Sequence, residues 1–242
     1  MPTYRDEAIA LRTMRLGEAD RIVTFLTPEH GKVRAVAKGV RKTTSRLGAR
    51  VEPITHVALL CWRGRELDVV NQVDTLDAFR TIRDNLGLVQ VAVAMLEVAD
   101  QVAQERQAAP ELFALVLGAL RSLERSRSPV VLGAYLFKLL DLDGVRPIVE
   151  VCASCGSRGP LVAFDAGEGG MLCASCRRGQ AVSAEVVALV QAVLTGGLGR
   201  VLSDPPLDAV PAFERLATTA MEHHLDRRLR AARALSGAGE GS

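Results

Sequence analysis

Four cysteines in the second half of the chain have the types and spacing of metal ligands. Cys152 and Cys155 form one Cys-x-x-Cys pair, and Cys173 and Cys176 form a second pair after 17 intervening residues. Two residues between cysteines let a tight turn point both sulfurs at one ion, and two such turns supply the ligands of a tetrahedral zinc. Because sulfur would fill all four positions, the zinc has no place for a reactive water, and we expect it to be structural.

Disulfides, unrelated buried thiols and a redox Cys-x-x-Cys are the alternatives. Residues 1–5 lack the apolar segment of a signal peptide, so we expect a cytoplasmic chain whose thiols stay reduced. No βαβ pattern of a thioredoxin-like site lies near the cysteines. Apolar residues at 161–164 and 171–172 flank a glycine-rich tip, which predicts a small hairpin. Zinc held by this hairpin is the preferred interpretation.

A second stretch with evident chemistry lies nearer the N-terminus. Residues 31–51 include seven basic residues and no acidic one. Alternation along a strand at 32–38 places three of them on one outward face, and a loop rich in Ser, Thr and Arg follows. Such a surface suits a phosphate backbone, although a solvated strand face is the usual fate of a run of charge. The residues expected to contact DNA phosphates are Lys32, Arg34, Lys38, Arg41, Lys42 and Arg46.

The low aromatic content limits how bases would be bound. Aromatic residues make up 4% of the 242 residues, whereas many single-strand binders stack bases on several aromatic faces. We therefore expect sparse stacking, salt-sensitive binding and little preference among sequences.

The first eighty residues have the pattern of a small β-domain. A β-branched run at 21–27 and a return at 32–38 predict one hairpin, and runs at 57–62 and 66–70 predict another. With a strand at 8–11, about five short strands fit a barrel or sandwich, of which the five-stranded OB-type barrel is one. Cys61 lies in a predicted strand, and we expect it to be buried.

From Leu88 the apolar residues recur with a helical period. Helices are predicted to begin near Leu88, at Pro110, after a Ser128-Pro129 cap, after Ser183 and near Pro211, and the last is expected to run to about Leu235. His223 and His224 are adjacent and are expected to be solvated. The predicted class is therefore α+β, an N-terminal five-stranded OB-type β-barrel followed by an α-helical domain with an inserted four-cysteine zinc module. The expected segments are a barrel at 1–80, helical parts at 81–147 and 181–235, the zinc module at 148–180 and a disordered tail at 236–242.

Signatures of catalysis and of membrane insertion are missing from the sequence. It contains no G-x-x-x-x-G-K-[ST] phosphate loop, no H-E-x-x-H and no G-x-S-x-G. No apolar run approaches the length of a membrane span. We therefore expect a binding protein that is not an enzyme, uses no nucleotide and contacts no membrane.

Three blocks of the chain resemble the bacterial RecO family of DNA repair proteins, which are recombination mediators. The first block is 17–23 with Leu26-Thr27. The second runs from Gly31 through 37–42 to 45–48, and the third is Leu139-Leu140 with Gly144 and Pro147, leading into the first cysteine pair. The resemblance implies an OB fold followed by a helical domain that holds the zinc module.

The resemblance also implies a function. It implies binding of single- and double-stranded DNA, annealing of complementary strands without ATP, and help in loading the RecA recombinase onto single strands coated with single-stranded-DNA-binding protein. The implied partners are RecR and the acidic, apolar C-terminal tail of that coating protein, for which Arg121, Arg125 and Arg127 are candidate contacts. The implied location is the cytoplasm, at the nucleoid. A zinc-containing regulator of nucleic acids and a nuclease with unrecognised carboxylates are the alternatives.

Overall fold

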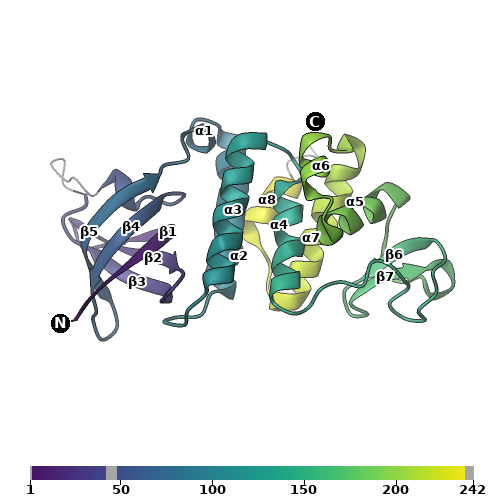
Figure 1. Ribbon diagram of the computed structural model, residues 1–242, viewed down its shortest axis with the longest axis horizontal. Coiled ribbons are helices and arrows are strands. Elements are labelled where there is room, and N and C mark those ends of the chain that lie inside the picture. The colour runs from purple at the N-terminus through teal and green to yellow at the C-terminus, as the bar shows by residue number, and fades with distance from the viewer. Residues whose placement is uncertain (1, 42–47, 238–242) are drawn as a thin grey trace. The chain divides into compact units, whose positions relative to one another are not determined.

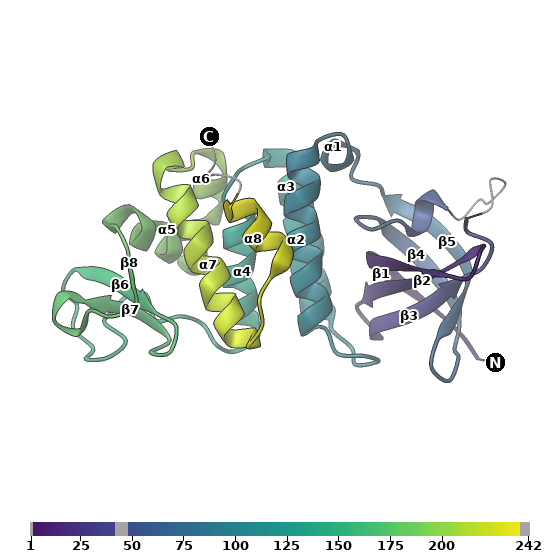
Figure 2. The same ribbon diagram turned by 180° about the vertical axis from the view of Figure 1, so that it is seen from behind.

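The computed structural model describes residues 2–41 and 48–237, with side chains described as far as residue 235. The chain forms two compact units, Met1–Glu124 and Arg125–Ser242. The first contains a β-barrel and three helices, and the second contains further helices and a small sheet (Figures 1 and 2).

Five strands close the barrel of the first unit. They are β1 (Thr3–Leu16), β2 (Asp20–Thr27), β3 (Gly31–Ala37), β4 (His56–Trp62) and β5 (Asp68–Asp77). Their order is β1-β2-β3-β5-β4, with β4 returning to β1. In the described residues of the barrel, β3 and β5 form a parallel pair and the other neighbouring strands pair antiparallel. This arrangement confirms the predicted five-stranded OB-type barrel.

The length of β1 lets one strand pair with two neighbours. Its first half pairs with β4 and its second half with β2, and a bulge between Ala10 and Arg12 separates the two parts. A bulge bends a strand and increases its twist, which is what closing a small barrel requires. Inside, alternate residues such as Val33, Ala35 and Leu59 are buried. Cys61 is fully buried as predicted, and this burial raises the pKa of its thiol to about 12.

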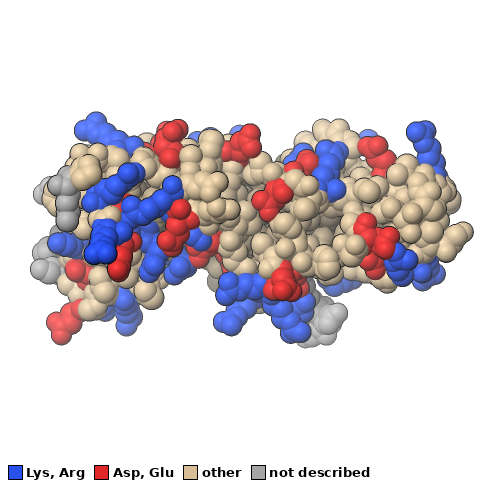
Figure 3. Space-filling view, turned by 90° about the horizontal axis from the view of Figure 1, so that it is seen from below, with Lys and Arg blue, Asp and Glu red and all other residues tan. Residues whose placement is uncertain are grey.

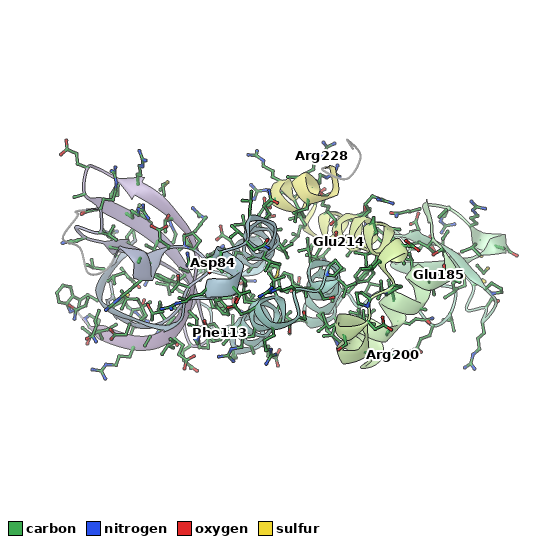
Figure 4. The ribbon with its side chains drawn as sticks, turned by 90° about the horizontal axis from the view of Figure 1, so that it is seen from above. Asp84, Phe113, Glu185, Arg200, Glu214 and Arg228 are labelled. Atoms are coloured by element: carbon green, nitrogen blue, oxygen red, sulfur yellow. The ribbon has the colours of Figure 1, made fainter. Side chains whose placement is uncertain are left out.

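Helices cover part of the outer barrel surface. They are α1 (Arg80–Arg83), which was not predicted, α2 (Leu86–Val102) and α3 (Pro110–Ser126). The side chain of Asn85 caps α2 by accepting a hydrogen bond from the N–H of Leu88. Because α2 contacts β1 and β2, the outward residues Thr24 and Leu26 are buried as well as the inward ones. The first compact unit therefore extends well past the last strand. Phe113 of α3, labelled in Figure 4, packs its ring 5.8 Å from that of His56 on β4.

The second unit is built on α4 (Val131–Leu142), α5 (Ala184–Thr195), α6 (Leu198–Ser203), α7 (Val210–Leu225) and α8 (Arg230–Gly237). α4 packs against both α5 and α7. Ser183 caps α5, and Gly196 ends it with a φ of 106°, as the sequence predicts. Within the described residues, no helix has the length and apolarity needed to cross a membrane.

Two helical predictions need correction, and one helix was missed. α4 begins at Val131, because the N–H of Val131 bonds to the carbonyl of Ser128 in a turn before the helix. α6 was not predicted. The prediction of one last helix running to about Leu235 is wrong, because Asp226 adopts a φ of 47° and separates α7 from α8. The carboxylate of Glu222 accepts the N–H of Leu229 and pairs with Arg233, so it holds the chain in its new direction.

His224 also differs from the solvated side chain that was expected. Its Nε2 pairs with the carboxylate of Asp143, which follows α4. This contact ties the end of α7 to the end of α4.

The contact between α4 and α7 gives a direct test of the packing. A Cβ at Gly133 would lie 2.4 Å from Cε1 of Phe213. We expect Gly133→Ala to destabilise the second unit by about 1–3 kcal/mol because two packed helices must separate. Gly118→Ala on the exposed side of α3 is the matched control. Nothing lies within 4 Å of that position, so it should be neutral or stabilise by about 1 kcal/mol. Urea unfolding of both variants measures the difference, and equal stabilities would contradict this packing.

Candidate metal centre and nucleic-acid surface

The cysteine-rich segment folds as the predicted hairpin. β6 (Leu161–Asp165) pairs with β7 (Gly170–Cys173), and β8 (Gln180–Ala181) adds to the other edge of β6. Cys152 and Cys155 lie in the turn before the hairpin, Cys173 ends β7, and Cys176 ends the 3-10 turn that follows. Two turns therefore present two cysteines each.

The four sulfurs converge on one point. They all lie within 4.8 Å of one another, and the sulfurs of Cys155 and Cys173 are 3.8 Å apart. A tetrahedral zinc with bonds of about 2.3 Å has sulfur–sulfur edges of about 3.8 Å, whereas a disulfide requires about 2.05 Å. The donor set therefore fits zinc, and it leaves the expected ion with a closed coordination shell.

Two glycines form the turns that the spacing requires. Gly156 has a φ of 72° and donates its N–H to the carbonyl of Cys152 at 2.8 Å. Gly179 also has a φ of 72°, and a Cβ there would lie 2.3 Å from the carbonyl oxygen of Phe164. Both positions exclude a side chain through backbone conformation, and at Gly179 through lack of space as well.

Backbone N–H groups point at the sulfurs. The backbone of Cys173, with those of Cys155 and Ser154, lowers the pKa of the Cys152 thiol to about 6. Hydrogen bonding with Cys155, then burial and the other thiols, raise the pKa of Cys176 to about 12. Four thiolates and one Zn²⁺ sum to a charge of −2, which the sequence positions of Arg158, Arg177 and Arg178 lead us to expect these cations to offset, but Arg178 pairs with Glu168 near the hairpin tip. The same expectation for Arg158 and Arg177 stays a prediction.

The apolar core of this module is very small. It consists of Cys152, Ala163, Leu172 and Cys173, so two of its members are candidate ligands. The module is joined to the helices through the preceding segment, where the side chain of Gln191 on α5 donates to the carbonyl of Val149. So small a core supplies little hydrophobic stabilisation, which makes the fold of the module dependent on metal.

The structure separates the six predicted DNA contacts into groups. Lys32 donates its Nζ to the carbonyl oxygen of Asp100 at 2.5 Å and lies 3.6 Å from its carboxylate. Arg34 is half-buried, and its Nε has no hydrogen-bond partner. Lys38 and Arg41 are exposed just beyond β3. Lys42 and Arg46 lie outside the described residues.

The expectation that Lys32 and Arg34 face open water is therefore corrected. Lys32 binds α2, which covers the outer surface of the neighbouring β2. The sequence contains a signal for this cover, because residues 22–26 of β2 are apolar or buried on both faces instead of alternating. Arg41 is anchored at the loop, where its Nη1 donates to the carbonyl of Glu18 at 2.9 Å. Lys and Arg side chains gather over the barrel in Figure 3, interspersed with acidic ones.

A group of convergent metal ligands elsewhere would suggest other chemistry. In residues 2–41 and 48–237, the four cysteines are the set whose ligand atoms come together, and no set of three carboxylates or histidines does so.

Comparison with known families decides the relationship. A family model described as Recombination protein O N terminal matches residues 1–79, and one described as Recombination protein O C terminal matches residues 83–233. The chain belongs to the RecO family. The resemblance carried by the three sequence blocks is thereby confirmed. RecO membership supports a role as a mediator of recombination in DNA repair. The N-terminal RecO match covers the whole barrel, and the C-terminal match includes the four cysteines.

We predict one zinc per chain, measured by elemental analysis of protein prepared in reducing buffer with added zinc. Cys155→Ser should lose the zinc and unfold the hairpin, because the metal supplies on the order of 10–16 kcal/mol in zinc-finger peptides. Cys61→Ala is the matched control, since it removes a thiol from the barrel core and should leave the zinc content unchanged. Wild-type protein that holds no zinc would remove the claim.

Proposed function

We propose that this chain binds single- and double-stranded DNA, anneals complementary strands without ATP and helps to load the RecA recombinase. Its substrate would be single-stranded DNA coated with single-stranded-DNA-binding protein. The proposal rests on an OB-type barrel with exposed cations just after the end of β3. The chain that forms this barrel belongs to the RecO family. Such work on chromosomal DNA would take place in the cytoplasm, at the nucleoid, and we propose that location for the protein.

Annealing on this surface is an electrostatic process. Two complementary strands repel each other through their phosphates, and bound cations reduce that repulsion and release condensed counterions. Lys38 and Arg41, continued by Lys42 and Arg46 along the chain, supply that charge. A zinc ion held by four thiolates would supply only structure, because it has no open coordination position.

The protein partners are proposed on chemistry and on the family. We propose that RecR binds the chain, and that the second unit receives the acidic, apolar tail of the single-stranded-DNA-binding protein. A hollow of about 370 Å³ beside α4 and α7 is lined by apolar residues and by His223 and His224, with no carboxylate among its lining residues. This lining suits the apolar part of that peptide, and leaves His223 for its acidic groups because His224 already pairs with Asp143.

A second hollow fits that peptide less well. It lies between α5 and α6 and includes Glu185, Arg200 and Asp204 (the first two labelled in Figure 4). Two carboxylates against one guanidinium would repel an acidic tail. Arg121, Arg125 and Arg127 line neither hollow, and their role stays a prediction.

The phosphate surface predicts a measurable salt dependence. Four contacts at about −0.7 each give a slope of log affinity against log salt near −3 on single strands. Lys38→Ala/Arg41→Ala should flatten this slope by about 1 to 1.5 and weaken binding to all sequences alike. Lys32→Gln is the matched control, since it removes a cation that already binds Asp100. It should lower the unfolding temperature and leave the slope unchanged. An unchanged slope in the double variant, or a loss confined to one sequence, would refute this surface.

Annealing should depend on the same charges and not on nucleotide. With labelled complementary oligonucleotides, we expect Lys38→Ala/Arg41→Ala to slow annealing in parallel with its loss of affinity. Added ATP should leave the rate unchanged in both proteins, because the sequence contains no phosphate loop. A wild-type rate equal to that of the strands alone would overturn the annealing proposal. Strand scission on addition of Mg²⁺ would favour a nuclease instead.

A further inference from the structure

Trp62 differs from every other aromatic residue of the chain. The chain contains one Trp, two Tyr and six Phe, and all nine lie in the described part. Trp62 is 42% exposed, whereas the six Phe and Tyr135 are buried and Tyr4 is half-buried. An indole in water at the end of a strand contributes little to the barrel core. Its exposure leaves part of the ring accessible to a ligand outside the chain.

Strand pairing places Trp62 in a row with apolar neighbours. Trp62 of β4 is paired with Val69 of β5, and Val69 is paired with Val36 of β3. All three point outward, because Cys61, Val70 and Ala35 beside them point into the core. Val36 and Val69 are half-buried, so the row is an apolar strip that ends in an exposed ring. Lys38 follows two residues after Val36 on the same side of β3.

Three cations and one carboxylate lie near the ring, and further acidic groups lie farther along the strand. Arg63, Arg65 and Glu66 are exposed in the turn after Trp62, and Arg5 is exposed on β1, opposite Leu60, so the group carries a net positive charge. Glu7 and Asp74 instead flank Ala58, four residues or about 13 Å along β4. The surface around Trp62 therefore suits an anion, and the other end of the same face does not.

The turn that carries these cations is held rigidly. The buried carboxylate of Asp68 accepts the N–H of Gly64 at 2.9 Å, the hydroxyl of Tyr4 at 2.6 Å and the guanidinium of Arg106 at 3.2 Å. A Cβ at Gly64 would lie 1.9 Å from the carbonyl oxygen of Leu67, so the turn requires glycine. The guanidinium of Arg63 lies 5.5 Å from the ring centre of Tyr4. Trp62 is thus presented from a preorganised backbone.

We infer that Trp62 stacks against one unpaired base of single-stranded DNA, with Lys38, Arg63 and Arg65 beside the flanking phosphates. An aromatic face accepts any base, which agrees with binding that ignores sequence. Bases of a duplex are stacked on both faces and present none to an indole. Trp62 therefore makes the barrel prefer single strands over duplex. This inference rests on the proposed DNA binding, and adds a base contact to a surface otherwise made of phosphate contacts.

The single tryptophan makes the contact directly observable. Oligo-dT should quench the tryptophan fluorescence of the wild-type protein saturably. An abasic oligonucleotide of equal length has the same phosphates without bases, and should bind with little quenching. Equal quenching by the two oligonucleotides would overturn the inference, since charge alone would then explain the signal.

Variants separate stacking from charge. Trp62→Ala should weaken oligo-dT binding by about 5- to 100-fold, the range for one stacked base, and Trp62→Phe should retain part of the affinity. The salt slope should not change, because stacking releases no counterions. Duplex affinity should also be unchanged, which serves as the control for folding. Leu76→Ala, at another exposed apolar residue of the barrel, should have no effect.

The outcomes distinguish this inference from the proposed function. Wild-type protein that binds neither DNA would refute DNA binding itself. Binding of oligo-dT that is unaffected by Trp62→Ala would refute only the role of Trp62. Equal losses on single strands and duplex would also refute it, because the residue would then act as a general contact.

Discussion

Closure of the five-stranded barrel is the constraint on which the DNA-binding account depends. Because β1 pairs with both β2 and β4, the sheet has no free edge there, and its outer surface divides into two parts. α2 covers the part over β1 and β2, and its Asp100 also binds Lys32 of the adjacent β3. The part where β3, β5 and β4 meet carries Val36, Val69 and Trp62. Among the described residues, Lys38, Arg63 and Arg65 are exposed cations beyond the covered part, and Arg41 is exposed while bonded to the carbonyl of Glu18.

The cysteine module is limited by a different constraint, the small apolar surface that it buries. A hairpin of two short strands buries too little apolar surface to be stable alone. Four sulfurs that converge within 4.8 Å would replace that missing core with metal–ligand bonds if they hold the proposed zinc. Its strands are tied back to α5 through Gln191 and the backbone of Val149, so its folding is linked to that of the helical unit. We therefore regard zinc as a determinant of architecture in this chain, and DNA chemistry as the work of the barrel.

Local patterns predicted much of this structure, and long-range contacts limited the rest. The alternation around Val33, the cap at Ser183 and the turn within each Cys-x-x-Cys pair depend on near neighbours. The first two are confirmed, and the four sulfurs lie together as expected, while their binding of zinc stays a prediction. Lys32 was misplaced because its partner Asp100 lies 68 residues away. The break after α7 was missed because it depends on Glu222 binding Arg233 across the turn. The exposure of Trp62 likewise follows from strand register and not from its own short segment.

The central claim is that DNA lies along the rim of the barrel where β3 ends and β4 turns into β5. Photo-crosslinking of the full chain to a single-stranded oligonucleotide containing 5-bromodeoxyuridine, followed by peptide mapping, tests this most directly. The account predicts crosslinks in two regions, residues 38–41 and residues 62–65, with Trp62 among the modified positions. Crosslinks confined to residues 125–237 would place the DNA on the helical unit and contradict it.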